Sequence, residues 1–345
     1  MPHRVTIQPS GHQFSVEDDE TILEAALREG HSLPYGCRNG ACGACKGKVL
    51  SGQVDYGEHS PTALKDEEKA QGRALFCRAT PLSDLTIEAR EIGAAKDIVV
   101  KTLPCRVEKL EKRADDVMLM KIKLPASERL QFLAGQYIDF QLKDAKARSF
   151  SLANPPHDDA LLELHIRHVP GGLFTDQVFS TLKERDILRL KGPLGSFFIR
   201  DDSDKPMIFI AGGTGFAPIK SMLEHAFAEH TRRELVLYWG ARSLKDLYMA
   251  ELPQQWMAEH PNFSFIPVLS NPQPGDAWQG RTGFVHQAVL ADFADLSGYQ
   301  VYACGAPVMV DTARDSFLKM RNLPEEEFFA DPFVYAADAE TAPAG

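Results

Sequence analysis

Four cysteines carry the clearest chemistry in this sequence. Three of them are closely spaced, at Cys37, Cys42 and Cys45, and the fourth follows at Cys77. A C-x4-C-x2-C run with one distant cysteine is the spacing in which four thiolates hold a [2Fe–2S] cluster. The residues between the first three are mostly small, which lets the backbone wrap closely around a cluster. The sequence therefore predicts a centre that moves one electron at a time, with these cysteines as its metal ligands.

Two alternatives exist for the same cysteines, a zinc site and disulfide pairing. Zinc ribbons usually present two C-x2-C pairs, and this chain has one, at Cys42 and Cys45. The remaining two of the six cysteines, Cys105 and Cys304, have no obvious role as a pair. That usage suits a reducing compartment, because disulfides persist mainly in oxidising ones. The stretch 34–45 resembles the cluster loop of plant-type ferredoxins.

A second motif, the run Arg148-Ser149-Phe150-Ser151, resembles the R-x-[Y/F]-S flavin motif of the ferredoxin–NADP⁺ reductase superfamily. The resemblance implies that Arg148 binds the flavin pyrophosphate, for which a guanidinium is suited by its bidentate hydrogen bonding. It also implies that the Phe150 ring lies beside the isoalloxazine and that the Ser151 hydroxyl lies near flavin N5. Tyrosine is the commoner aromatic in this superfamily, so any hydrogen bond made by the tyrosine hydroxyl is absent here.

Two further turns strengthen the flavin interpretation. Gly171 and Gly172, followed by Thr175 and a helical stretch, match the G-x-x-[S/T] turn that the superfamily places at the flavin pyrophosphate. Glycines before a helix N-terminus can cradle a phosphate. The Gly-Pro-Leu-Gly run at 192–195 matches the superfamily's G-P-x-G turn. Each piece alone could be a plain loop, whereas all of them in this order predict bound FAD.

A third motif indicates a nicotinamide dinucleotide. The run Gly212-Gly213-Thr214-Gly215 follows a continuous apolar strand and opens a helix, the setting in which a glycine-rich turn binds pyrophosphate. It resembles the G-G-T-G-x-x-P turn of the same superfamily. Cys304 and Gly305 end what we expect to be the last strand, and resemble the superfamily's Cys-Gly-x-Pro turn, whose cysteine lies beside nicotinamide C4. A buried structural cysteine is the alternative for Cys304.

Three more residues complete the expected site. Superfamily members carry an acid and an aromatic residue near the flavin close to the chain's end, and Asp331 and Phe333 fill those places. Core packing is the alternative for Phe333. Arg242 would suit the 2′-phosphate of NADP. However, a G-x-R pattern with a later Asp-Leu-Tyr, here at 246–248, also occurs in NADH-using flavin reductases. We therefore expect NADH, with NADPH as the alternative.

Periodicity and resemblance together divide the chain into three domains. Residues 1–93 combine short strands, a helix and the cluster loop, and resemble the β-grasp fold of ferredoxins. Residues 103–202 carry many short strands between glycines and prolines, which predicts a closed antiparallel β-barrel for FAD. Residues 203–335 alternate apolar strands with helices, which predicts a doubly wound parallel sheet for NAD(P). We expect residues 94–102 to be a linker and 336–345 a disordered tail.

Length and charge limit the functions that the chain could have. Its 345 residues suit two or three domains, and its net charge of -10 argues against nucleic acid as a partner. The sequence has no run of about 18 apolar residues, the length of a membrane span. Its N-terminus shows no signal-peptide pattern. We therefore expect a cytoplasmic protein without a membrane span.

From end to end, the order of these segments resembles that of the reductase components of multicomponent oxygenases. It also resembles the CDP-6-deoxy-glucoseen reductase type, which serves the dehydrase that makes 3,6-dideoxyhexoses. The resemblance implies that NADH reduces FAD, that the cluster takes the electrons singly, and that a partner oxygenase or dehydrase receives them. Two other functions stay open: a reductase of free flavin or ferric chelates, and a redox sensor that binds a regulatory partner. The complete set of hydride-transfer motifs favours an enzyme over a sensor.

Overall fold

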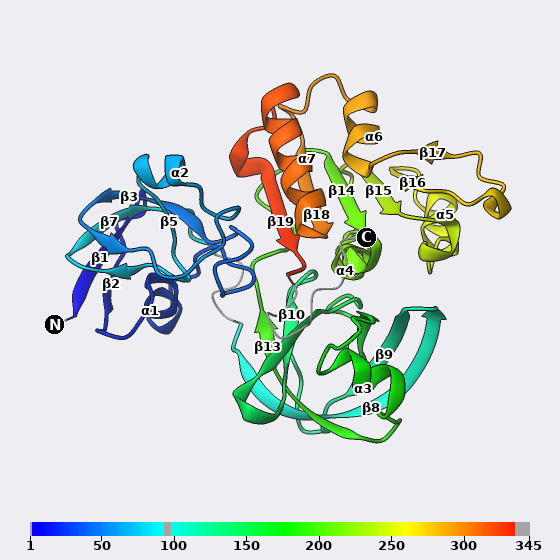
Figure 1. Cartoon of the computed structure of the whole chain (residues 1–345), viewed down its shortest axis with the longest axis horizontal. Coiled ribbons are helices and arrows are strands. Elements are labelled where there is room, and N and C mark those ends of the chain that lie inside the picture. The colour runs from blue at the N-terminus through cyan, green and yellow to red at the C-terminus, as the bar shows by residue number, and fades with distance from the viewer. Residues whose placement is uncertain (1, 93–97, 335–345) are drawn as a thin grey trace. The chain divides into compact units, whose positions relative to one another are not determined.

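The computed structural model describes residues 2–92 and 98–334 of the chain. The chain divides into two compact units, residues 1–99 with 195–197, and residues 100–194 with 198–345 (Figure 1). The predicted barrel and the predicted parallel sheet belong together to the second unit. Residues 94–97 of the expected linker, and the whole expected tail, lie outside the described residues.

The first unit is a small mixed sheet with a helix packed on it. Its elements are β1 (His3–Gln8), β2 (Gln13–Val16), α1 (Ile22–Arg28), β3 (Lys46–Ser51), β4 (Val54–Asp55), α2 (Asp66–Ala70), β5 (Arg73–Leu75), β6 (Thr80–Pro81) and β7 (Leu85–Glu88). The main sheet has the order β2-β1-β7-β3-β5, and β4 pairs separately with β6. Strand β1 pairs antiparallel with β2 and parallel with β7. These are the parts of the expected β-grasp fold.

Helix α1 shows how the local sequence sets this structure. The Thr21 hydroxyl accepts the N–H of Glu24 at 3.2 Å, and the Glu24 carboxylate accepts the N–H of Thr21 at 3.0 Å, so two unpaired donors at the helix start are satisfied. Ile22, the first helical residue, is fully buried in the core of the unit. Three acidic residues, Asp18, Asp19 and Glu20, lie just before the helix. One of them, Glu20, forms an ion pair with Arg28 at the last turn, at 2.8 Å.

The first part of the second unit is a closed barrel. Its elements are β8 (Lys101–Ala114), β9 (Val117–Lys123), β10 (Tyr137–Gln141), β11 (Ala147–Ser151), β12 (Leu162–Arg167), α3 (Thr175–Ser180) and β13 (Ile187–Leu194). The strands follow the order β11-β10-β13-β8-β9-β12, and every pairing is antiparallel. A further antiparallel bridge joins Leu152, just after β11, to Leu164 of β12. The two edge strands therefore meet, and the sheet closes as predicted.

The second part is a six-stranded parallel sheet. Its elements are β14 (Met207–Gly212), α4 (Phe216–Ala228), β15 (Leu235–Ala241), α5 (Glu251–Glu259), β16 (Phe263–Leu269), β17 (Arg281–Thr282), α6 (Val285–Asp292), β18 (Gln300–Gly305), α7 (Pro307–Met320) and β19 (Phe328–Pro332). The order is β17-β16-β15-β14-β18-β19, with every pairing parallel. The expectation that β18 is the last strand was wrong, because β19 follows it and pairs with it.

Helices cover both faces of this sheet. Ile208 and Ile210 of β14 share a core with Val289 of α6 and Phe317 of α7. Neighbouring residues of a strand point to opposite faces, and on the other face Phe216 of α4 stacks on a tryptophan of β15 at 4.0 Å between ring centroids. The doubly wound fold is therefore confirmed. Among residues 2–92 and 98–334, no helix combines the length and the apolar character of a membrane span.

Candidate functional site

The four predicted cluster ligands come from two segments of the first unit. Cys37, Cys42 and Cys45 lie between α1 and β3, and Cys77 follows β5; all four are free thiols. The N–H of Cys37 donates to the Cys42 sulfur at 3.4 Å. A hydrogen bond from the Cys42 thiol, together with three N–H groups of the loop, lowers the pKa of Cys37 to about 6. The same hydrogen bond raises the pKa of Cys42 well above its usual value, so this part of the loop favours one thiolate of the pair, and thiolate is the form in which cysteine binds a metal.

Gly40 shows why the cluster loop needs a residue without a side chain. Its φ is 79°, in the left-handed region, and a Cβ there would lie 2.8 Å from the Arg78 side chain and 3.0 Å from the Glu58 carbonyl oxygen. The Gly40 carbonyl accepts the N–H of Ser60 at 3.0 Å, and the Arg78 guanidinium donates to the Glu58 carbonyl at 2.9 Å. The loops around the cysteines are therefore tied together, and a larger residue at position 40 would push them apart.

The predicted flavin residues lie on β11 of the barrel. Arg148 and Phe150 share one face of this strand, because they are two residues apart, and Ser151 points to the other face. The half-buried Phe150 ring lies 5.4 Å from the ring of Phe174. The Arg148 guanidinium donates to the carbonyl of the preceding residue at 2.8 Å, and Ser151 is buried. The guanidinium and the aromatic ring are thus presented together on one strand, as a bound flavin would require.

The turn before α3 is held by its own side chains. The Thr175 hydroxyl donates to the Val169 carbonyl at 3.0 Å and accepts the Val169 N–H at 3.1 Å. The Asp176 carboxylate accepts the N–H of Gly171 at 3.1 Å. A Cβ on Gly172 would lie only 2.5 Å from the Thr175 hydroxyl oxygen. These groups therefore set the shape of the turn, and Thr175 would have to exchange a hydrogen bond before it could contact a phosphate.

The predicted dinucleotide turn, residues 212–215, lies at the switch point of the parallel sheet. The strand order reverses between β14 and β18, and ligands of such sheets bind at the carboxyl ends of the strands beside that point. The register pairs Ala211, at the end of β14, with Cys304 of β18. A Cβ on Gly215 would lie 2.1 Å from the Cys304 carbonyl oxygen, and Gly305 has a φ of 144° that other residues avoid. The two turns, separate in sequence, are therefore in direct contact.

Cys304 is more deeply buried than contact with a nicotinamide requires. Its side chain is 0% exposed, and burial, together with the Asp331 carboxylate, raises its pKa well above the usual value. Asp331 is its register partner on β19, and the N–H of Phe333 donates to the Gly305 carbonyl at 2.8 Å. The C-terminal residues of the predicted site are thus brought beside Cys304. A nicotinamide that reached the sulfur would have to displace the side chains that cover it.

Arg167 is a candidate that the sequence motifs missed. It ends β12, and its Nη2 lies 3.0 Å from the position that a Cβ on Gly213 would take. Its Nη1 pairs with Asp116 at 2.5 Å, while the Gly213 carbonyl accepts the Trp239 indole N–H at 3.0 Å. The guanidinium therefore lies against the dinucleotide turn, where it is suited to a pyrophosphate. No local pattern marks it, because β12 and this turn are far apart in sequence.

A buried network of charged groups connects the barrel to α4, the helix that follows the dinucleotide turn. Glu163 lies 3.0 Å from His165 Nε2 and 3.3 Å from Lys220 Nζ, and His165 Nδ1 lies 2.9 Å from the Tyr248 hydroxyl. Lys220 also donates to the Ala153 carbonyl at 3.2 Å. Burial by itself would raise the pKa of Glu163. The hydrogen bond with His165 and the positive charge of Lys220 together have the larger effect, and they hold this pKa well below its usual value. Burial lowers the pKa of His165.

Arg242, the residue expected to affect the choice of nucleotide, is exposed just after the end of β15. The next residue, Ser243, donates its N–H and its hydroxyl to the Asp246 carboxylate at 2.9 and 2.8 Å. Asp246 therefore caps this turn. Arg242 lies at the carboxyl end of the strand next to β14, which is where a ribose or its 2′-phosphate binds in such sheets.

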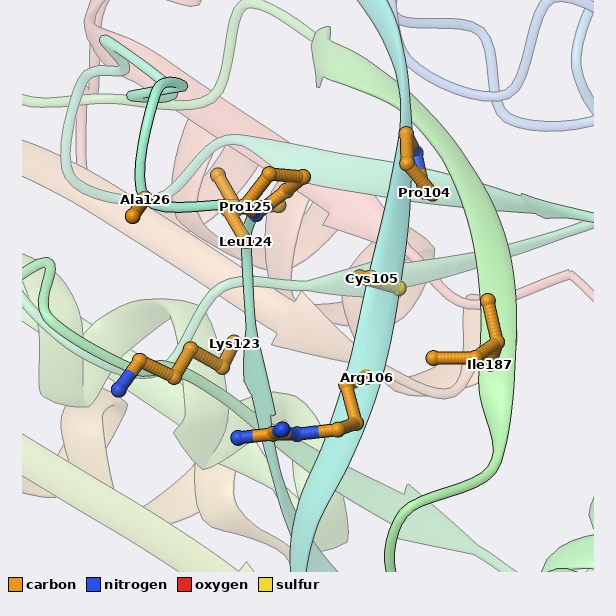
Figure 2. Close-up of a pocket in the computed structure, with 8 residues that line it drawn as sticks. All are labelled: Pro104, Cys105, Arg106, Lys123, Leu124, Pro125, Ala126 and Ile187. Carbon is orange, nitrogen blue, oxygen red and sulfur yellow. The ribbon is translucent and has the colours of Figure 1, made fainter.

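A hollow of about 370 Å³ lies on the barrel, but it is not formed by the flavin residues (Figure 2). Cys105 and Arg106 of β8, Leu124 after β9 and Ile187 of β13 contribute to its lining. None of the predicted flavin residues lines it. Burial raises the pKa of Cys105 to about 12, so its thiol keeps its proton and a structural role suits it.

Three known protein domains match this chain in the order that the motifs predict. A 2Fe-2S iron-sulfur cluster binding domain matches residues 5–82. An oxidoreductase FAD-binding domain matches residues 104–199, and an oxidoreductase NAD-binding domain matches residues 209–315. The predictions of a [2Fe–2S] cluster, FAD and a nicotinamide dinucleotide as cofactors are confirmed.

Full-length relatives share this organisation. The chain is 40% identical to the CDP-6-deoxy-L-threo-D-glycero-4-hexulose-3-dehydrase reductase of Yersinia pestis, over 97% of this chain and 99% of that protein. It is 41% identical to the phenol 2-monooxygenase reductase component DmpP of a Pseudomonas species, over 98% of this chain and 96% of that protein. Among solved structures, the cytochrome P450 reductase GcoB of Amycolatopsis has a TM-score of 0.76 at 35% identity, covering 96% of this chain and 98% of its own.

Proposed function

Because this chain belongs to the reductase components that join a plant-type ferredoxin domain to the FAD and NAD domains of the ferredoxin–NADP⁺ reductase superfamily, we propose that it supplies electrons from NADH to one of two kinds of partner. These are an oxygenase component or a dehydrase that acts on a nucleotide-linked hexulose. The chain is an electron-transfer oxidoreductase that works with a redox partner protein. The observation that carries the proposal is the group of four free cysteines, three from one loop and Cys77 from another segment, since a reductase of free flavin has no need of a one-electron exit.

The flavin side of the site uses residues of β11. When bound, FAD accepts two electrons and releases them one at a time, and the cluster carries them singly. In our proposal the Arg148 guanidinium binds the flavin pyrophosphate and the half-buried Phe150 ring lies against the isoalloxazine. The Ser151 hydroxyl supplies a hydrogen bond near flavin N5. Gly171 and Gly172 shape the turn that receives the phosphates.

The nicotinamide side uses the switch point of the parallel sheet. The dinucleotide turn, Gly212-Gly213-Thr214-Gly215, offers main-chain N–H groups to the pyrophosphate, and we assign Arg167 as its cationic partner. Cys304, Asp331 and Phe333 form the end of the site that receives the nicotinamide ring. The Cys304 thiol keeps its proton, because its pKa is raised, so it orients the ring as a neutral group.

Arg242 interacts with the adenosine ribose in this proposal, and NADH is the preferred donor. We also propose a cytoplasmic location, because Cys105 and Cys304, the two cysteines outside the proposed cluster, form no disulfide, which suits a reducing compartment.

The test is an anaerobic titration of the whole purified protein with NADH. We expect a rhombic EPR signal from one unpaired electron in the reduced protein, and NADH-dependent reduction of cytochrome c. Cys42→Ser should lose the signal and most of the cytochrome c rate while keeping NADH oxidation with ferricyanide, which takes electrons directly from flavin. Cys105→Ala is the matched control and should behave like the parent protein. An unchanged cytochrome c rate in Cys42→Ser would favour the free-flavin reductase instead.

The kind of partner is tested by reconstitution. Purified oxygenase and hexulose dehydrase components are added separately to the reductase with NADH and their substrates. We expect one of them to support product formation that saturates with partner concentration and stops without the reductase. If neither the oxygenase nor the dehydrase formed product with the reductase and NADH, the proposed class of acceptor would be contradicted.

A further inference from the structure

Three side chains that can bind a metal ion meet in the first unit, outside the cysteine loop. His12 lies in the turn between β1 and β2, His31 follows α1, and Glu91 follows β7. His12 Nδ1 lies 2.9 Å and His31 Nδ1 lies 3.1 Å from the Glu91 carboxylate. The ligand atoms of all three residues lie within 4.8 Å of one another. Three elements that are separate in sequence therefore bring two imidazoles and a carboxylate to one point.

The backbone holds these three segments together. The N–H of Ile7 donates to the His12 carbonyl at 2.8 Å, which fixes the turn that carries His12. The N–H of Ile92, next to Glu91, donates to the carbonyl of Ser32, next to His31, also at 2.8 Å. The two imidazole rings lie 5.3 Å apart with an angle of 32° between their planes. Because the main chains are already joined, only side-chain rotation is needed to bring the ligand atoms around an ion.

The burial of the group suits an ion that enters from solvent. His31 and Glu91 are 19% and 20% exposed, whereas His12 is 61% exposed on the outer side. Two mostly buried ligands and one exposed ligand leave a path for the ion and a position open to water. In the structure these groups form a hydrogen-bonded His–Glu–His cluster.

The donor set identifies the class of ion. Two imidazoles and one carboxylate, with one position open, are a ligand set of zinc sites, whereas Mg²⁺ and Ca²⁺ prefer oxygen ligands alone. Ligand atoms of a tetrahedral zinc site lie roughly 3.3 Å apart, given Zn–N distances of about 2.0–2.1 Å, close to the contacts of Glu91. We propose that His12, His31 and Glu91 bind one Zn²⁺ ion on the ferredoxin domain, separate from the [2Fe–2S] cluster. The ion would join the β1–β2 turn, the end of α1 and the chain after β7, and so stabilise the first unit.

The test is isothermal titration of Zn²⁺ into the whole protein, loaded with cluster and FAD and free of any histidine tag. We expect one Zn²⁺ per chain, and an affinity at least tenfold lower in Glu91→Gln and in His12→Ala. His12 is exposed, so its replacement leaves the core intact. His3→Ala, on β1 of the same sheet, is the matched control and should bind like the parent. Lowering the pH from 7.5 to 5.5 should weaken binding, because imidazole must be neutral to bind the metal.

The position of the ion is tested with crystals grown with Zn²⁺. Anomalous maps are recorded just above and just below the zinc absorption edge, so that iron contributes to both maps and zinc only to the first. We expect a zinc peak between the Nδ1 atoms of His12 and His31, with the iron content unchanged. The proposal would be overturned by a zinc peak elsewhere or by displacement of iron. It would also be overturned if both variants bound Zn²⁺ as tightly as the parent protein, or if the parent protein did not bind one Zn²⁺ per chain.

Discussion

Arg148 is the residue on which FAD affinity should depend most. Arg148→Ala removes the charge-assisted hydrogen bond that we propose to the pyrophosphate, worth about 1.5–3 kcal/mol, so the affinity for FAD should fall roughly ten- to hundredfold. Flavin should separate from the variant during gel filtration, which the ratio of flavin to protein absorbance measures. Arg189→Ala, an exposed arginine of β13 in the same barrel, should keep its flavin. Equal flavin content in the two variants would rule out the role of Arg148.

Cys304 should affect the speed of hydride transfer more than the affinity for the dinucleotide. Its thiol is neutral and buried at the switch point, so Cys304→Ala removes the ring positioning that we propose for it but leaves the proposed pyrophosphate contacts in place. Stopped-flow reduction of the flavin by NADH should slow, while the dinucleotide concentration at half-maximal rate should change little. Cys105→Ala, in the barrel core, should reduce at the parent rate. If Cys304→Ala also reduced its flavin at the parent rate, Cys304 would have a structural role.

At the scale of elements, the start of α4 depends on a glycine. A Cβ on Gly215 would lie 2.1 Å from the Cys304 carbonyl oxygen and 2.8 Å from the Gly305 nitrogen, and both of these are main-chain atoms that have no freedom to move aside. Gly215→Ala should therefore push β18 and the dinucleotide turn apart, lowering both the melting temperature and NADH affinity. Gly298→Ala, where a Cβ would meet nothing within 4 Å, is the control. Calorimetry and NADH titration of the two variants measure the difference.

The docking of α4 on the barrel should depend on pH. The pKa of Glu163 lies below its usual value in the folded protein, so its ionised form stabilises the fold above about pH 4.3, and this contribution is lost as the pH falls below that value. The pKa of His165 is also lowered, so the unfolded chain takes up its proton first and stability decreases below about pH 6.5. The melting temperature should therefore decrease steadily from about pH 6.5 to pH 3.

Glu163→Gln tests this interpretation. It removes one of the two carboxylates that pair with the buried Lys220, leaving Glu224 at 2.9 Å. We expect a loss of about 1–3 kcal/mol at pH 7 and a flatter stability profile below about pH 4.3. Glu128→Gln removes a surface pair with Lys101 and should change stability by less than about 1 kcal/mol. Thermal unfolding at a series of pH values compares them; parallel profiles for Glu163→Gln and the parent protein would count against the network.

At the scale of the whole molecule, the two units should divide the electron path. Residues 98–345 keep all of β8, which begins at Lys101, and both cores of the second unit. We expect this shorter chain to bind FAD and to oxidise NADH with ferricyanide at a rate near that of the full chain. It should lose most of its cytochrome c reduction, because the cluster is the expected one-electron exit. Equal cytochrome c rates would place the exit at the flavin.

Some expectations were wrong or incomplete because distant segments decide them. The strand β19 carries Asp331 but was not predicted as a strand, since its pairing with β18 is what makes it one. The Thr175 hydroxyl is hydrogen-bonded to Val169 in the structure, and its expected place at the flavin phosphate stays a prediction. Arg167 and His165 carry no local signature, and their partners lie on other elements of the same unit.

The sequence by itself determined the order in which the three domains match, and it predicted the four cysteine ligands, the flavin strand around Arg148 and the dinucleotide turn. Each of these depends on residue types and spacings within a short stretch of chain, where backbone geometry alone sets what the residues can bind. Only the tertiary structure decided that Cys304 is buried against Gly215, that Arg167 lies over Gly213, and that His12, His31 and Glu91 meet. These contacts join residues from separate elements, so they exist only once sheet register, barrel closure and core packing have brought those elements together.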